Sequence, residues 1–266
     1  MLIVIRTFIL SLNLWLLLNG LTEIKYLKYI KHYIDSFTLG LFIPGQVGDA
    51  SLAYFLKKKG IPYNKGGLVY FLDKFISVLI LFTIAYIGTI ILLEKLNSVI
   101  FLMIPIIIII IIVILIQIIL KVDIRLPYYQ KIKTGLQNTL VSLKEFKKKW
   151  HLLIINIFLT VINWTILALI YYIVFYSLGA NLPFPEVGII PIISSLVAYI
   201  PISIGGIGTV EFAAIELFSM IGAAEQTVLS TYLIIRLFIY LSTAILFFIF
   251  TYNHRKMIYV PNKKKL

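Results

Sequence analysis

The sequence contains no cysteine among its 266 residues. This absence excludes disulfide bonds, thiolate metal sites and cysteine nucleophiles. Charged residues are also scarce, at 13% of the chain, and an average soluble domain has about 25%. Outside the loop at 121–150 the chain has no long polar segment. A separate soluble catalytic domain therefore does not fit this sequence.

Histidine is rare as well, because the chain has only His32, His151 and His254. They are scattered near the ends of apolar runs, where a position at the membrane interface is favoured over metal binding. The sequence shows no Ser/His/Asp set and no paired carboxylates suited to hydrolysis. We therefore expect no metal, no cofactor and no enzymatic activity, and a membrane-embedded enzyme is the weakest function considered.

Hydrophobic residues are abundant, at 61% of the chain, and the mean hydropathy is +1.02. They form long continuous runs, unlike the short alternating segments of a transmembrane barrel. The composition predicts an all-α polytopic bundle of about five spanning helices, forming a single membrane domain over 1–266. Runs long enough to span a bilayer lie at 2–20, 67–93, 100–120, 152–178 and 227–252.

The net charge of +13 comes from lysines and arginines that lie mainly between the apolar runs. That placement favours orientation in the bilayer and attraction to anionic lipids over nucleic-acid binding. With the positive loops in the cytoplasm, the N-terminus is outside and the C-terminus inside. We expect a plasma-membrane protein with a first half at 1–98, a span and basic cytoplasmic loop at 99–150, a second half at 151–252 and a basic tail at 253–266.

A proline and glycine break interrupts the apolar segment at 33–59. Pro44, Gly45 and Gly48 separate two arms, and each arm is too short to cross about 30 Å of hydrocarbon at about 1.5 Å per residue. The pattern favours a re-entrant helical hairpin, and a single broken span is the alternative. Just before it, basic and apolar residues recur at helical spacing over 25–32, which predicts a short helix along the interface.

The second half contains the more informative break. Pro201 removes a backbone donor, and Gly205, Gly206 and Gly208 permit backbone angles that other residues avoid. Glu211 follows at once. Broken backbone at membrane depth is tolerated only within protein or beside a wet cavity. Together with an adjacent charge, it indicates a functional site.

Short arms on either side of this break predict a second hairpin at 187–221. In the orientation given above, it enters the membrane from the outside, and the first hairpin enters from the inside. Paired Gly/Pro-interrupted segments in two halves of a chain point to a transport site within a repeat. We therefore expect an inverted repeat whose two breaks meet inside the membrane.

Two signatures in the sequence resemble those of a known family. The first is Pro44-Gly45-x-x-Gly48-Asp49 followed by Asp73-Lys74, and the second is Pro201-x-Ser203-x-Gly205-Gly206-x-Gly208-x-x-Glu211 followed by Gly222 and Arg236. On these residues the chain resembles the lysylphosphatidylglycerol synthase transmembrane-region family over nearly its whole length. That family includes the flippase half of the bacterial multiple peptide resistance factor. The resemblance implies lipid translocation or lipid handling, without lipid aminoacylation.

The chain departs from the family pattern at three places. Ile204 stands where a proline often precedes the Gly-Gly pair. Only the lysines of 57–59 follow the first Gly-Asp element, where the family commonly has an arginine. The family also usually carries another N-terminal helix, so we expect a shortened start.

Glu211 and Arg236 are the strongest candidates for substrate binding. Glu211 can bind a cationic headgroup, a proton or Arg236, and it can also cap the helix that begins near Thr209. Arg236 can pair with Glu211 or Glu216, or hold a lipid phosphate through its guanidinium fork. A purely structural ion pair is the alternative for Arg236.

Further candidates for the substrate site are Ser203, Gly205, Gly206, Gly208, Gly45, Gly48, Asp49, Asp73 and Lys74. The glycines of the second break can direct backbone N–H groups at a phosphate, or they can simply form a tight turn. Asp49 can face the cavity or cap a helix. Asp73 and Lys74 are adjacent and cannot share one helix face, so we expect at least one of them to point inward.

These features together predict an integral membrane lipid translocase that moves an anionic or polyprenyl-linked lipid between leaflets. The alternative is a non-transporting membrane partner that positions a lipid-modifying or glycosyl-transferring enzyme through the basic loop at 121–150. The expected partners are membrane lipids, with a homo-oligomer or an enzyme of a lipid or glycan pathway as further candidates. Nucleic acid is not expected.

Overall fold

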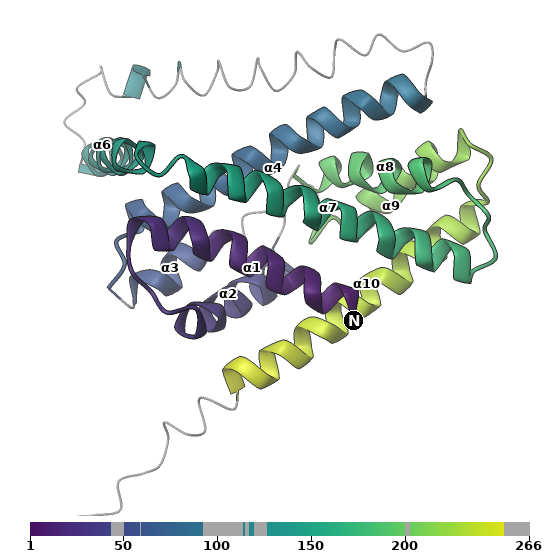
Figure 1. Cartoon of the computed structure of the whole chain (residues 1–266), viewed down its shortest axis with the longest axis horizontal. Coiled ribbons are helices and arrows are strands. Elements are labelled where there is room, and N and C mark those ends of the chain that lie inside the picture. Colours follow the sequence, from purple (N-terminus) through teal and green to yellow (C-terminus); the bar gives the residue numbers. More distant parts are fainter. Residues whose placement is uncertain are drawn as a thin grey trace, which may run out of the picture.

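The computed structural model describes residues 1–43, 51–58, 60–92, 114, 117–119, 127–199 and 203–252. Over these ranges the chain forms helices joined by turns, which confirms the all-α prediction (Figure 1). The helices are α1 (Leu2–Leu21), α2 (Tyr26–Gly40), α3 (Ser51–Lys57), α4 (Tyr63–Leu92), α6 (Pro127–Lys147), α7 (His151–Ser177), α8 (Phe184–Ser194), α9 (Thr209–Ser219) and α10 (Glu225–Phe247). A 3-10 segment, η2 (Ser195–Tyr199), follows α8, and a π-helical segment, η3 (Phe248–Tyr252), extends α10.

Four helical stretches are long and apolar enough to cross a membrane. They are Leu2–Leu21, Tyr63–Gly88, His151–Ser177 and Glu225–Thr251. These stretches agree with four of the predicted spans, and the protein is a multi-pass membrane protein. The remaining predicted span, at 100–120, lies almost entirely outside the described residues.

Two sets of shorter helices separate the long ones. After α1 come α2, with 15 residues, and α3, with 7 residues. After α7 come α8 and α9, with 11 residues each. At about 1.5 Å per residue none of them reaches across roughly 30 Å of hydrocarbon. Pro191 lies inside α8 and removes one helical hydrogen bond, and the chain tightens into η2 within the next turn.

Helix α2 corrects the prediction for the segment that follows α1. One continuous helix runs over Tyr26–Gly40, where the sequence suggested an interfacial helix at 25–32 and then a separate apolar arm. The sequence has no proline or glycine before Gly40 that would end the helix near His32. The same helix therefore carries the basic residues at its start and buried apolar residues, such as Ile34, further along.

The core consists of two clusters of buried apolar side chains. One cluster belongs mostly to α7–α10 but includes Leu81 of α4. The other belongs mostly to α1–α4 but includes Leu246 of α10. The two clusters are connected through long helices, with α4 packed on α8 and α10 packed on α2 (Figure 1). These contacts, together with the contact between α1 and α7, join α1–α4 to α7–α10.

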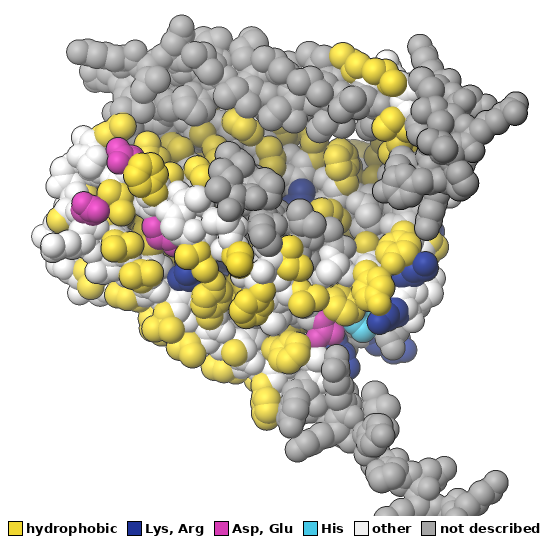
Figure 2. Space-filling model, turned by 180° about the vertical axis from the view of Figure 1, so that it is seen from behind, with side chains coloured by type: hydrophobic (Ala, Val, Ile, Leu, Met, Phe, Trp, Pro, Cys, Tyr) yellow, Lys and Arg dark blue, Asp and Glu magenta, His cyan; other side chains and the backbone are white. Residues whose placement is uncertain are grey.

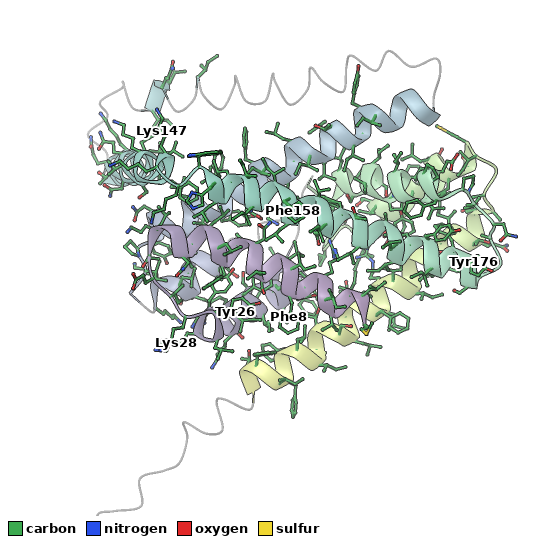
Figure 3. All side chains as sticks on the ribbon, viewed as in Figure 1. Phe8, Tyr26, Lys28, Lys147, Phe158 and Tyr176 are labelled. Atoms are coloured by element: carbon green, nitrogen blue, oxygen red, sulfur yellow. The ribbon has the colours of Figure 1, made fainter. Side chains whose placement is uncertain are left out.

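Basic side chains gather at the end of the molecule where α1 finishes. Lys65 Nζ donates to the Leu21 carbonyl at 2.9 Å, and Lys149 Nζ donates to the Gly20 carbonyl at 2.6 Å. Figure 3 shows Lys28 and Lys147 at this end and Tyr176 at the opposite end. In the space-filling view, several Lys, Arg and His side chains gather at one end of a largely hydrophobic face with an acidic side chain beside them, and other acidic side chains lie toward the opposite end (Figure 2).

Candidate functional site

A cavity of about 290 Å³ lies inside the bundle. Its charged lining residues are Arg6 of α1, Asp73 and Lys74 of α4, Glu211 of α9 and Arg236 of α10. The two residues from α4 and the arginine from α10 lie near the middle of spanning stretches. A charged side chain at that depth costs about 2.5 kcal/mol or more. The collection of such groups around one cavity marks it as the candidate substrate site.

The turn before α9 is built from glycines in the left-handed region of the backbone. The φ angles are 57° at Gly205, 76° at Gly206 and 82° at Gly208. Residues with a Cβ rarely adopt such angles. Gly208 is the N-cap of α9, and its backbone N–H donates to Glu211 Oε2 at 2.8 Å. Glu211 therefore caps the helix that it belongs to.

Close packing also requires two of these glycines. A Cβ at Gly205 would lie 3.0 Å from the carbonyl oxygen of Leu41. A Cβ at Gly206 would lie 2.8 Å from Val210 Cγ2 and 3.2 Å from Ala198 Cβ. The chain just after α2 thus lies directly against the glycine turn before α9. Leu41, which precedes the first break, lies beside the second break at this point, while Pro44, Gly45 and Gly48 lie outside the described residues.

Ser203 and Thr209 fasten the turn to the start of α9. Their hydroxyl oxygens lie 2.9 Å apart, and the Thr209 hydroxyl also donates to the Gly206 carbonyl at 3.2 Å. Of the predicted residues in this turn, Gly205 lines the cavity, whereas Ser203, Gly206 and Gly208 do not. These three residues therefore stabilise the turn and do not line the cavity.

The guanidinium of Arg236 binds Glu211 and the turn together. Its Nε donates to Glu211 Oε1 at 2.9 Å, and its Nη2 donates to the same oxygen. Its Nη1 donates to the Gly205 carbonyl at 3.1 Å. The partner of Arg236 is thus Glu211, while Glu216 is exposed. The ion pair joins α9 to α10 and holds the glycine turn between them.

In this geometry Glu211 occupies the position at the start of α9 where a phosphate site was predicted. Both oxygens of Glu211 accept hydrogen bonds, one from Arg236 and the other from the Gly208 backbone. The Gly208 N–H is therefore directed at a carboxylate of the protein. A phosphate could receive this donor only if Glu211 moved away.

Asp73 belongs to a buried polar cluster that joins α1, α4 and α7. Asn156 Nδ2 donates to Asp73 Oδ1 at 2.9 Å, and Asn13 Nδ2 approaches the same oxygen at 3.4 Å. Asn13 Nδ2 also donates to Thr160 Oγ1 at 3.1 Å, and Asn156 Nδ2 to Asn13 Oδ1 at 2.9 Å. Charge-assisted bonds of this kind hold a carboxylate among apolar helices.

Asp73 and Lys74 both line the cavity, which agrees with the expectation that at least one of them points inward. Successive residues of an α-helix lie about 100° apart around its axis, and the cavity is wide enough to meet both. Asp73 is buried, while the longer side chain of Lys74 places Nζ 5.7 Å from the centroid of the Tyr70 ring.

The other predicted candidates fall outside the described residues. These are Gly45, Gly48 and Asp49. Within the ranges that the structure describes, no group of three or more His, Cys, Asp or Glu residues could hold a metal ion. The charged groups of the cavity are suited to binding an ionic headgroup.

Several cavity residues were not among the predicted candidates. Arg6 could have been predicted from the sequence, because a lone charge within an apolar run indicates a functional site. Asn163 and Trp164, near the middle of α7, are also buried beside the cavity. Tyr171 and Tyr232 line it with their ring centroids 4.8 Å apart. The tyrosines gave no signal, because the chain has 17 of them and only packing decides which ones face inward.

Comparison with known proteins gave one family. The family model described as "Lysylphosphatidylglycerol synthase TM region" matches residues 1–246. No curated protein and no solved structure matches the chain significantly. The matched region covers nearly all of the described helices, including every charged residue named above as lining the cavity.

Proposed function

Since the chain belongs to the lysylphosphatidylglycerol synthase transmembrane-region family, we propose that it moves an anionic or polyprenyl-linked lipid between the leaflets of the membrane. The matched family model covers a transmembrane region, and translocation is a function that such a region can perform by itself. The charged cavity is the observation that carries the proposal.

The position of the cavity fits a translocation pathway. Asp73, Lys74 and Arg236 lie near the middle of helices that can span a bilayer, so a headgroup held there would be halfway between the leaflets. The positive groups of the cavity would attract a phosphate, and Arg236 could turn its guanidinium fork to it only by releasing Glu211. The acyl tails would stay in the surrounding bilayer while the headgroup crosses.

Two re-entrant hairpins would provide the movement. We assign the first to 33–59 and the second to 187–221, entering from opposite sides. The short lengths of α2, α8 and α9 and the contact between Leu41 and Gly205 support this assignment. Displacement of either hairpin would open the cavity toward one leaflet.

An inverted repeat would account for the order of the helices. A long helix, two short ones and a long one occur as α1–α4 and again as α7–α10. The packing of α4 on α8 and of α10 on α2 is reciprocal. Glu211 and Arg236 are 25 residues apart, and Asp49 and Lys74 have the same spacing in the sequence. Asp49 lies outside the described residues, so this last correspondence concerns the sequence alone.

Reconstituted protein tests the proposal directly. Proteoliposomes containing tail-labelled fluorescent phosphatidylglycerol would be treated with an impermeant quencher, and the fraction of protected lipid would be followed in time. We expect wild-type protein to move the lipid, and Glu211→Gln and Arg236→Gln to slow it at least tenfold. Glu216→Gln is the matched control, because it removes an exposed carboxylate from the same helix. Wild-type protein that moves neither this lipid nor a polyprenyl phosphate, beside a working scramblase, would contradict the proposal.

A second candidate function is that of a membrane partner for a lipid-modifying or glycosyl-transferring enzyme. Helix α6 supports it, because Leu140, Val141 and Leu143 are exposed beside lysines such as Lys144 and Lys147. This function predicts that neutralising the lysines of α6 abolishes a complex in native membranes and that Glu211→Gln does not. Loss of lipid movement in Glu211→Gln with the complex intact would favour translocation.

A further inference from the structure

In the polar cluster that joins α1, α4 and α7, few donor hydrogens face many acceptor oxygens. Asn13 Nδ2 has two hydrogens but lies near three oxygens, at 3.1 Å from Thr160 Oγ1 and at 3.4 Å from both Asp73 Oδ1 and the Asn156 carbonyl. The side-chain oxygen of Asn156 is buried and has no hydrogen-bond partner among the described residues. A buried acceptor without a partner is destabilising. A positively charged ligand would complete these oxygens.

The cluster is dry and lies inside the membrane-spanning part of the molecule. Asn13, Asp73, Asn156 and Thr160 have relative exposures of 2%, 5%, 1% and 3%, and all four belong to helical stretches that can cross a bilayer. A carboxylate at such depth is rare and marks ion pathways in membrane proteins. Oxygens of carboxylate, amide and hydroxyl groups are the ligands of hard cations. A cation would contact several of these oxygens at once, whereas a proton on Asp73 adds a single donor.

From these observations we propose that the cluster binds a sodium ion, with oxygens of Asp73, Asn13, Asn156 and Thr160 as ligands. An amide oxygen has two lone pairs, so Asn13 Oδ1 can contact the ion while it accepts from Asn156 Nδ2 at 2.9 Å. Only Asp73 of these four side chains is charged, which suits a monovalent cation better than calcium, whose sites combine several carboxylates. The set contains no histidine and no second carboxylate, so the sequence patterns typical of metal sites do not reveal it.

The ion site shares one residue with the cavity. Asp73 lines the cavity, whereas Asn13, Asn156 and Thr160 are not among its described lining residues. Sodium in the cluster would change the charge that a headgroup meets at Asp73, and by linkage the headgroup would change the affinity for sodium by the same factor. Resting on the proposed translocation, this contact lets a sodium gradient drive lipid movement.

Sodium titration of the detergent-solubilised protein tests the site. Thermal unfolding would be followed in rising sodium chloride at an ionic strength held constant with N-methylglucamine chloride, and potassium chloride would be titrated in parallel. A ligand that binds only the folded protein stabilises it by mass action, so the melting temperature should rise by about 3–5 °C once sodium reaches tenfold its dissociation constant. Equal melting temperatures in the three salts would overturn the proposal and leave the cluster as a structural contact between helices.

Substitutions in α7 test the ligands. Thr160→Val removes the hydroxyl with little change of shape and should weaken sodium binding about tenfold, as expected for one lost ligand in a buried site. Thr165→Val is the matched control, because Thr165 is exposed and its hydroxyl bonds within α7. Equal sodium affinities of the two variants would overturn the assignment of Thr160. Asn156→Asp adds a second carboxylate and should make the melting temperature respond to calcium, a gain that loss of folding cannot imitate. A folded Asn156→Asp protein that ignores calcium would count against the site.

Proteoliposomes separate the ion site from the proposed translocation. A sodium gradient should speed the movement of labelled lipid at least threefold for wild-type protein, relative to equal sodium on both sides, and should have little effect on Thr160→Val. Movement that ignores the gradient, in protein that binds sodium, would overturn the coupling. Sodium-dependent stability without any lipid movement would refute translocation alone, and lipid movement by a protein whose stability ignores sodium would refute the ion site alone.

Discussion

Glu211 makes two contacts, and substitution of Arg236 removes one of them while leaving the other in place. One oxygen caps α9 through the Gly208 N–H, and the other receives Arg236. The cap is local in sequence, whereas the ion pair bridges 25 residues. Because Glu211 is buried and Arg236 is mostly shielded, each charge stabilises the other.

At this scale we predict that Arg236→Gln destabilises the protein more than the double variant Glu211→Gln with Arg236→Gln. The single variant leaves a buried carboxylate without its cation, which costs about 3–5 kcal/mol, while removal of both charges costs much less. Thermal unfolding in a single detergent would measure both. A double variant that unfolds as early as the single variant would show that the pair is not coupled in this way.

The glycine turn is the element that packs against the chain just after α2. Its positive φ angles fix the direction in which α9 leaves the turn, and the missing side chains allow Leu41 and Ala198 to approach. The need for a positive φ angle is common to these glycines, but the need for a missing side chain is not. Gly206 has both a positive φ and close neighbours, whereas a Cβ at Gly208 would meet nothing within 4 Å.

We therefore predict that Gly206→Ala is more harmful than Gly208→Ala. A left-handed backbone costs an alanine about 1–2 kcal/mol at either position, and Gly206→Ala adds a clash with Val210 and Ala198. Gly67→Ala serves as a control, because Gly67 has an ordinary helical backbone and open space around its Cβ. Melting temperatures should fall in the order Gly67→Ala, Gly208→Ala and Gly206→Ala, from highest to lowest. Equal melting temperatures for the last two would mean that packing at the turn contributes little.

The whole molecule has one basic end and one end with acidic residues. Lys65 and Lys149 converge on the last residues of α1, and the lysines labelled in Figure 3 lie at the same end. The loops between α7 and α8 and between α9 and α10 contain no Lys or Arg. From the positive-inside rule we predict that the basic end faces the cytoplasm.

Because the chain has no cysteine, an introduced cysteine would be its sole thiol and can report this orientation. Lys28→Cys and Lys147→Cys at the basic end should react with an impermeant maleimide only after the cells are opened. Asn181→Cys, in the exposed loop before α8, should react in intact cells. Labelling in the reverse pattern would invert the orientation proposed for the protein.

The sequence by itself determined the membrane class, the positions of the four long apolar helices that the structure describes, the glycine turn of the second break and the basic segments. These features are local, because hydropathy, proline, glycine and charge act on the few residues around them. The absence of proline and glycine between Tyr26 and Gly40 also favoured a continuous α2, and the prediction of a separate interfacial helix gave this local signal too little weight.

Only the tertiary structure decided which polar groups meet. Asn156 reaches Asp73 across 83 residues of sequence, and Asn13 reaches Asn156 across 143. Arg236 binds Glu211 and not Glu216 because α9 presents one face to α10 and the other to its surroundings. Asn163 and Trp164 acquire their place beside the charges in the same way. Contacts of this kind depend on how separate helices are packed, and spacing along the chain carries no record of that packing.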